Sequence, residues 1–235
     1  MMQLQTFGPG FGEPDASPFC LKAMCFLHMS DVEWQSVPNS DSRKAPYQKL
    51  PVLVSGNDTI ADSDNIRQYL EQVTGTDFDA ALNDQQRAQS RAVIRMAEDH
   101  LYFCLVYDRW MTDESWMQLK KHFFSGMPLP LRWLIPDMVR RNVICNLKGQ
   151  GMGRLEYSRM LERANKDIAA IKDMLTDRSF LFGDTPTAAD VSVVAVLTSI
   201  AANPINTGLQ QLVATDSQLT EYIARGKRAF FPGTL

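Results

Sequence analysis

The sequence predicts a two-domain α+β protein, with a small N-terminal βαβ-ββα domain followed by an all-helical C-terminal domain. Before about residue 75, short apolar segments alternate with helical patterns, whereas the later segments all have helical spacing. The 235 residues, 45 % of them apolar, are enough for two small domains that share an interface.

Turn and cap signals divide the N-terminal half. Ser17-Pro18 starts a helix, because serine is a good N-cap and proline suits the first helical position. SGND at 55–58 is a turn after the branched run LPVLVS. We therefore expect, in order, a strand at 2–7, a helix at 18–29, strands at 32–37, 50–55 and from 59, and a helix at 63–72.

The C-terminal half is predicted to be helical throughout. Its segments are a long helix at 84–111, a stretch broken by the prolines at 128–136, and, after GQGMG, a helix at 154–176. DTPTAADV then opens a nearly all-apolar helix that must be buried in a bundle. Thr187-x-x-Asp190 there is a capping box, which we interpret as folding machinery. We place the domains at 1–74 and 84–235, with a linker at 75–83.

Composition excludes several classes of function. A net charge of −3 argues against nucleic-acid binding, and the three histidines have no ligand spacing with the four cysteines, so no metal is expected. The cysteines include no CxxC pair, which favours free thiols in a reducing compartment. No apolar run approaches the ~18 residues of a membrane span. We expect a cytoplasmic protein without membrane insertion.

The stretch SPFC carries the first candidate chemistry. A helix start collects unpaired amides and the positive end of the helix dipole, which stabilise an anion such as a thiolate. The Ser17 hydroxyl could donate to that thiolate, and Cys20 would lie one turn inside the helix. The same residues also form an ordinary capped helix start, and without a second cysteine at position 17, Cys20 cannot perform intramolecular dithiol chemistry.

Two further motifs combine structural and functional interpretations. Pro51 in QKLPVLV opens a strand, where a proline is tolerated because no ladder donor is needed. Asp62 and Ser63 in IADSDNI precede an apolar-periodic helix and could simply cap it. Alternatively, the amides, hydroxyl and carboxylate there could hold the α-carboxylate and α-amine of a γ-glutamyl group.

The order and separation of SPFC, KLPVL, ADS and FGDTPTAAD resemble the glutathione transferase superfamily over nearly the whole chain. The S-P-F start and K-L-P-V-L resemble the plant tau-type enzymes. SPFCLK, ADSDNI, EDHLYFCLVYDRW and QGMGR together are most similar to the failed-axon-connections and metaxin-like branch. The resemblance implies the glutathione transferase fold, in which the N-terminal domain is thioredoxin-like.

The resemblance also implies roles for individual residues. Ser17 would stabilise the glutathione thiolate, and Cys20 is the alternative catalytic residue. Glutathione would be bound by Phe19, Lys49, Val52 beside a cis-Pro51, Asp62 and Ser63. The electrophile would lie against the helix at 84–111, whose candidate contacts are Tyr102, Tyr107, Arg109 and Trp110; an aromatic stripe at this spacing also fits ordinary interdomain packing.

Two functional hypotheses follow. In the first, the chain is an enzyme that binds glutathione as co-substrate and directs its thiolate at a small electrophile or peroxide, with a thiol-transferase variant that uses Cys20. In the second, it is a non-catalytic, metaxin-like binding module. The resemblance implies a homodimer. The loop GPGFGEPDA is longer than usual, and residues 10–16 packed across Pro51 would contradict the first hypothesis.

Overall fold

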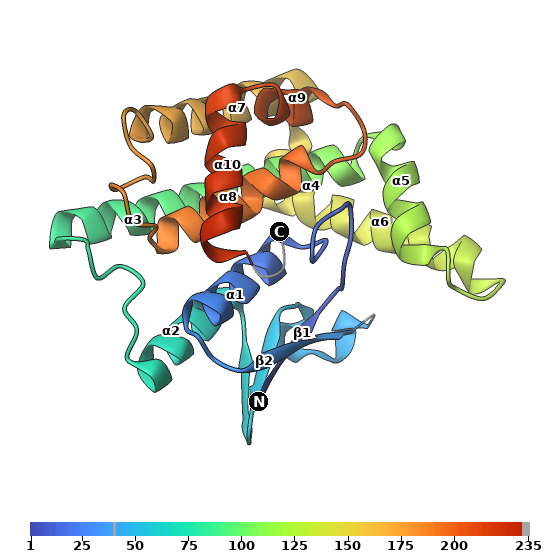
Figure 1. Cartoon of the computed structure of the whole chain (residues 1–235). Coiled ribbons are helices and arrows are strands. Elements are labelled where there is room, and N and C mark those ends of the chain that lie inside the picture. Colours follow the sequence, from blue (N-terminus) through green and yellow to red (C-terminus); the bar gives the residue numbers. More distant parts are fainter. Residues whose placement is uncertain (40, 232–235) are drawn as a thin grey trace.

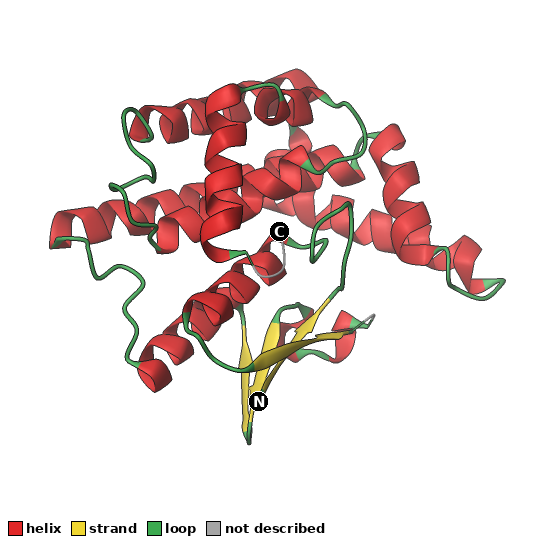
Figure 2. Cartoon of the chain, viewed as in Figure 1, coloured by secondary structure: helices red, strands yellow, loops and turns green. Residues whose placement is uncertain are grey.

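A computed structural model describes residues 1–39 and 41–231 and divides the chain into a sheet-containing half and a helical half (Figures 1 and 2). The sheet contains β1 (Met2–Thr6), β2 (Trp34–Pro38), β3 (Val52–Ser55) and β4 (Asp58–Ala61) in the order β2-β1-β3-β4. β1 pairs parallel with β2 and antiparallel with β3, and β3 is antiparallel to β4. The expected α+β fold is confirmed.

Two helices cover the face of this sheet that is turned toward the helical half (Figure 1). They are α1 (Pro18–Met29), whose bounds match the prediction, and α2 (Ser63–Thr74), which runs two residues beyond it. Residues 20–27 of α1 are all buried, because one side of the helix contacts the sheet half and the other contacts α8. Helix α1 is therefore core for both halves of the molecule.

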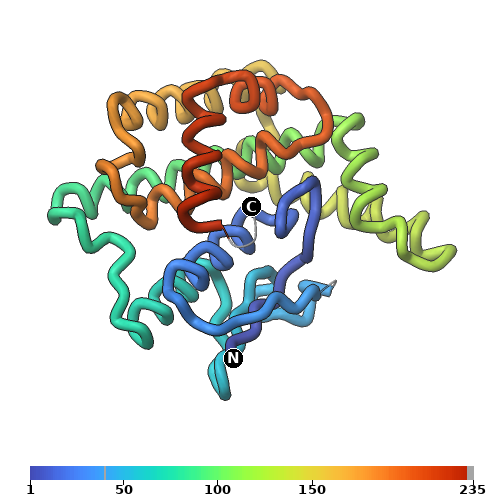
Figure 3. Tube along the Cα trace, viewed as in Figure 1, coloured from blue at the N-terminus to red at the C-terminus, as the bar shows by residue number. Residues whose placement is uncertain are grey.

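The helical half is built around α8 (Ala188–Ala201), in which residues 188–200 are all buried. This confirms the expectation of a central apolar helix. Figure 3 follows the chain from this helix to α10, which ends close to the start of α1. The other helices are α3 (Asp84–Met96), α4 (Tyr102–Trp110), α5 (Asp113–Phe124), α6 (Leu131–Gln150), α7 (Tyr157–Met174), α9 (Gly208–Ala214) and α10 (Ser217–Phe230).

Besides the longer α2, the structure departs from the predicted helices in three places. The helix expected at 154–176 runs from Tyr157 to Met174. The expected helix at 84–111 is interrupted by a π-helical turn at Ala97–Leu101, which separates α3 from α4. The proline cluster was expected to break the helix throughout 128–136, but Pro136 lies inside α6. It is only the sixth residue of that helix, so a single turn precedes it, and the break is confined to the residues before Leu131.

The segment between the halves is tied to both of them. Gly75 ends α2 in the left-handed region at φ +72°, a conformation that glycine adopts without strain. Phe78 packs on Phe26 of α1 with ring centroids 4.7 Å apart. Asp79 accepts from the Ala188 amide (3.0 Å) and from Arg67 (2.8 Å). The linker thus caps the central helix as well as connecting the domains.

Candidate functional site

Three segments that are distant in sequence meet in one small cluster. Cys20 from the first turn of α1 packs with Leu50 and Val52 at the start of β3 and with Ala61, the residue before Asp62. The Leu50–Pro51 peptide bond is cis, as the resemblance implied. The cluster brings SPFC, KLPVL and ADS to the same end of the sheet.

Ser17 begins α1 without using its side chain as a cap. Its backbone is extended (φ −102°, ψ 127°), and its hydroxyl caps no amide of the helix. That hydroxyl lies near the sulfur of Cys20 and acts to lower the pKa of its thiol. A donor in this place can therefore stabilise a thiolate, which is the chemistry expected of Ser17.

Asp15 holds the chain immediately before Ser17, and the sequence analysis missed it. Its carboxylate is 1 % exposed and accepts the amide of Gly8 at Oδ2 and the amide of Ser17 at Oδ1, both at 2.8 Å. Burial raises the pKa of Asp15, and the two amides partly offset that effect. An Asp two residues before a Ser in a Gly/Pro-rich loop is an Asx-turn signal that could have identified this contact.

Cys20 is 0 % exposed. Burial raises the pKa of its thiol well above the ordinary value, and the carboxylate of Asp15 raises it further. The thiol therefore stays protonated at neutral pH, whereas a reactive cysteine needs an accessible thiolate. This geometry disfavours Cys20 as the nucleophile and leaves Ser17 as the better candidate.

Asp62 and Ser63 form the entrance of α2. Asp62 lies at φ +79°, a region rarely occupied by residues other than glycine, and its side chain accepts the amide of Asp64 at 2.8 Å. Such backbone strain is concentrated at functional sites. Asp62 is exposed, whereas Ser63 is only 3 % exposed and lies in the first turn of the helix. A carboxylate, a hydroxyl and helix amides are thus presented together.

A charge network behind this entrance joins the two halves. The ammonium of Lys22, 1 % exposed, lies 2.5 Å from Asp64 Oδ1 and 2.6 Å from Glu98 Oε1. Arg95 pairs with the second oxygens of both acids, and Arg91 also reaches Asp64 at 3.0 Å. Burial alone would raise the pKa of Asp64, but these cations lower it to about 2. The network fixes the first turn of α2 against the helical half.

Two of the four candidate substrate contacts lie beside the start of α1. Tyr102 packs edge-on against Phe19, with ring centroids 4.7 Å apart. Arg109 donates to the carbonyl of Ala16 (2.9 Å) and to that of Ser199 (2.8 Å). Burial lowers the pKa of Arg109 to about 10, so it remains charged at neutral pH. Arg109 thus braces the residue that precedes Ser17.

The other two candidates point elsewhere. The Tyr107 hydroxyl donates to the Leu155 carbonyl at 3.1 Å, and its ring faces Tyr157. Trp110 stacks against Trp116 of α5 at 5.4 Å. The structure therefore does not bring Tyr107 and Trp110 together with Tyr102 and Arg109. Lys49 is exposed beside Leu50.

The long loop before α1 packs on the helical half. Phe11 lies under the guanidinium of Arg109 (5.0 Å) and against His122 of α5 (4.8 Å). Glu13 pairs with Lys227 of α10 at 2.5 Å, and Gly10 and Glu13 exchange two backbone hydrogen bonds. These contacts draw residues 10–16 toward α4, α5 and α10, whereas Pro51 belongs to the sheet half.

A thioredoxin-like sheet with a helix start beside a cis-proline, followed by a helical domain, defines the glutathione transferase class. Residues 18–115 match the glutathione S-transferase N-terminal domain family, and residues 164–226 match the glutathione S-transferase C-terminal domain family. The chain is 30 % identical to an isoprene-epoxide–glutathione S-transferase of Rhodococcus sp. (strain AD45), over 98 % of this chain and 99 % of that protein. The chain therefore belongs to the glutathione S-transferase family.

More distant relatives agree with this assignment. The chain is 28 % identical to Failed axon connections of Drosophila melanogaster, over 80 % of this chain and 47 % of that protein. It is 22 % identical to Metaxin-3 of Xenopus laevis, over 98 % and 77 % of the two chains. Glutathione transferase GSTFuA3 from Phanerochaete chrysosporium shares the fold with a TM-score of 0.69 at 14 % identity, over 98 % of this chain and 97 % of that one.

Proposed function

We propose that the chain binds glutathione across the cluster of Cys20, Leu50, Val52 and Ala61, and that Ser17 donates to the glutathione thiolate. The observation that carries this proposal is that the cluster unites the start of α1, the cis-Pro51 bond and the entrance of α2 at one end of the sheet. Ser17 there has a hydroxyl that is not engaged as a helix cap.

The residues at the start of α1 explain how the sulfur of bound glutathione would be stabilised as a thiolate. The first amides of a helix have no intrahelical partner and carry partial positive charge. Ser17 gives its own amide to Asp15, and Pro18 has none, so the amides of Phe19 and Cys20 are left to face an anion. With the Ser17 hydroxyl, these groups favour the thiolate over the thiol, and the proton leaves to solvent.

The remainder of the tripeptide fits the polar groups around this point. The backbone of Val52 beside Pro51 is suited to the cysteinyl amide. Asp62 and Ser63 are suited to the α-amine and α-carboxylate of the γ-glutamyl end, and the exposed Lys49 to the glycyl carboxylate. The charge network that fixes α2 keeps Asp62 and Ser63 in place for this purpose.

We further propose an epoxide as the class of electrophile, since one relative at 30 % identity is named for an isoprene epoxide. The thiolate attacks one epoxide carbon. A C–S bond forms as the C–O bond breaks, and the ring oxygen takes a proton from water. Tyr102 and Arg109, which flank the start of α1, are the candidate contacts of this substrate.

We also propose a cytoplasmic homodimer. The four cysteines are all free thiols, which supports a reducing compartment. The dimer is an inference from the family. A binding module without catalysis is the second candidate, favoured by the metaxin relatives that match 98 % of this chain.

Calorimetry and kinetics with glutathione test the proposal. We expect binding in the micromolar-to-millimolar range that is weakened by Ser63→Ala. Ser217→Ala is the matched control, because Asp216-Ser217 starts α10 as Asp62-Ser63 starts α2. No binding heat at millimolar glutathione would refute the proposal and favour the binding module.

The pKa of bound glutathione tests the role of Ser17 separately. A hydrogen bond to a charged group contributes roughly 1.5–3 kcal/mol, or about one to two pKa units. Ser17→Ala should therefore raise the pKa of bound glutathione by that amount, measured by ultraviolet absorbance of the thiolate. The rate constant kcat/KM for an aryl epoxide should fall about 10- to 100-fold at neutral pH. An unchanged thiol pKa would remove Ser17 from the mechanism.

A further inference from the structure

Helices α5 and α6 form a hairpin that carries large apolar side chains on its surface. Trp133 and Leu134 are each 69 % exposed, and Leu129 is 63 % exposed. Exposed apolar residues are common singly, but several gathered on one short hairpin mark a surface that contacts another phase or molecule. We call this group the hairpin patch and define it as Met117, Leu129, Leu131, Trp133, Leu134 and Met138, all at least 47 % exposed.

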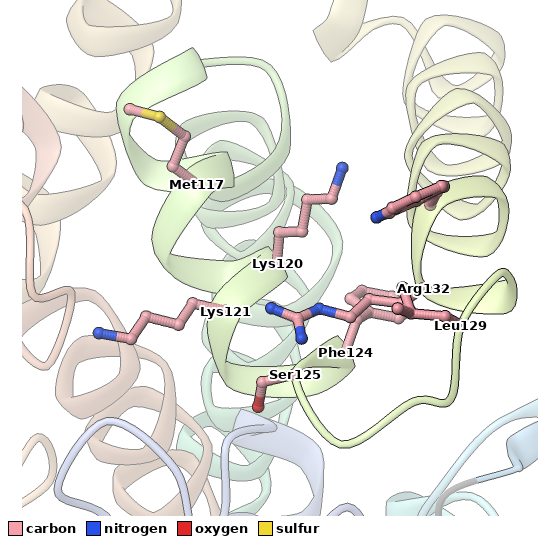
Figure 4. Close-up of a pocket in the computed structure, with 8 residues that line it drawn as sticks. Met117, Lys120, Lys121, Phe124, Ser125, Leu129 and Arg132 are labelled. Atoms are coloured by element: carbon pink, nitrogen blue, oxygen red, sulfur yellow. The ribbon is translucent and has the colours of Figure 1, made fainter.

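Basic side chains accompany the hairpin patch. Residues 113–141 of the hairpin contain five Lys or Arg residues and three acidic residues, whereas the whole chain has a net charge of −3. Lys120 pairs with Asp137 and Arg140 pairs with Asp113. Lys120 and Lys121 come from α5 and Arg132 from α6, and all three line the groove between the helices, with Lys120 and Arg132 extending between them in Figure 4. This groove has a volume of about 540 Å³ and is lined also by Met117, Leu129 and Trp133.

We propose that the α5–α6 hairpin docks on the surface of an anionic lipid bilayer. Tryptophan and leucine favour the boundary between headgroups and acyl chains, and lysine and arginine on the same element pair with anionic headgroups. The protein lies on the membrane and does not cross it. In agreement, none of the helices in the described part of the chain combines the length and apolarity of a membrane span.

Charge selects this occupant over a second copy of the chain. In a two-fold symmetric contact the same patch faces itself, so Lys121 and Arg132 of one copy would lie against a patch that carries the same two cations. Like charges brought together in this way oppose association. A surface of phosphate and carboxylate headgroups supplies the opposite charge to Lys121 and Arg132.

The same hairpin also touches the loop that leads to Ser17. Phe123 of α5 packs edge-on against Phe7 (6.4 Å) and Phe11 (6.2 Å), and His122 lies against Phe11. The hairpin that carries the patch is therefore in contact with the loop that leads to the start of α1.

Flotation of the full chain with lipid vesicles tests this inference independently of any glutathione chemistry. We expect co-flotation with vesicles containing phosphatidylserine, weakened in high salt and on pure phosphatidylcholine. Lys121→Gln/Arg132→Gln should weaken binding about 25-fold, because each basic residue near such a surface contributes roughly a factor of five. Trp133→Ser/Leu134→Ser should abolish it. Val73→Ser and Lys166→Gln, exposed on α2 and α7, are the matched controls and should bind as the wild type does.

Three results would overturn the inference. One is an absence of flotation with anionic vesicles. The second is equal flotation of the wild type and the Trp133→Ser/Leu134→Ser variant. The third is that the wild type forms a dimer and does not bind vesicles, while the Trp133→Ser/Leu134→Ser variant is monomeric. That result would assign the hairpin patch to contact with a second copy.

Discussion

Replacement of Asp190 by alanine should strongly destabilise the protein. The carboxylate is 0 % exposed and accepts four hydrogen bonds at the start of the central helix α8. Oδ1 accepts the Leu181 amide (2.9 Å) and the Tyr222 hydroxyl (2.7 Å). Oδ2 accepts the Thr187 amide (2.8 Å) and the Thr187 hydroxyl (2.7 Å). One side chain thus joins the helix start, the preceding loop and α10.

The magnitude follows from the donors that lose their acceptor. A buried donor without a partner costs about 1–3 kcal/mol, and two of the four donors are buried backbone amides. With the Tyr222 hydroxyl and the Thr187 side chain, and with allowance for non-additivity, we expect about 4–6 kcal/mol. That is a large share of the roughly 5–15 kcal/mol of a typical domain. Asp190→Asn keeps one acceptor oxygen and should lose less.

Urea denaturation followed by tryptophan fluorescence measures the effect as the shift in midpoint at constant slope. Asp184→Ala is the matched control, because Asp184 is exposed in the same loop and, among the residues that the structure describes, accepts from Ser179 alone at 3.2 Å. It should change the free energy of unfolding by no more than about 0.5 kcal/mol. A loss below about 1.5 kcal/mol for Asp190→Ala would refute the reasoning, because it would mean that the donors find other partners.

Three other predictions concern the site. Asp64→Asn should lower the free energy of unfolding by about 1–2 kcal/mol at neutral pH, a figure reduced to allow for the partial exposure of Asp64. The pKa of Asp64 is about 2 in the folded protein and near 3.9 in the unfolded chain. The stabilisation by its carboxylate is therefore present above about pH 3.9 and is lost as the pH falls toward 2. Urea titrations at several pH values should show the difference from wild type shrinking in acid. Asp15→Asn should lower kcat/KM for glutathione conjugation about tenfold, since it removes one charge-assisted acceptor of the Gly8 and Ser17 amides; an unchanged kcat/KM would separate Asp15 from the site. A thiol reagent such as Ellman's should modify one cysteine of the native protein, the exposed Cys145; fast loss of a second thiol would contradict the burial of Cys20, Cys25 and Cys104.

Much of the fold could be predicted because its signals are local. Serine followed by proline specifies the start of α1 at Pro18, and the capping box of Thr187 and Asp190 specifies the start of α8 at Ala188. The continuous apolar run after that box requires burial. The order of the motifs along the chain then identified the family, which the two domain matches show.

The features that could not be predicted depend on contacts between distant residues. Lys22 and Glu98 are 76 positions apart, and nothing near either residue announces their pairing. Arg109 was a candidate substrate contact from its place beside Trp110, but its donation to the Ala16 carbonyl depends on the packing of the long loop. Helical periodicity also could not distinguish Tyr107, which faces Leu155, from Tyr102, which faces Phe19.

The π-helical turn at Ala97–Leu101 joins α3 and α4 into one helical rod and rotates the side chains of α4 about the rod axis relative to those of α3. A π turn holds one residue more than an α turn, and each residue of a helix advances the side chains by about 100° around the axis. Deletion of one residue between 97 and 101 would regularise the rod and rotate α4 by that angle. Arg95 would still face Asp64, but Arg109 would turn away from Ala16. A one-residue insertion thus lets a single helical rod brace both α2 and the loop before α1.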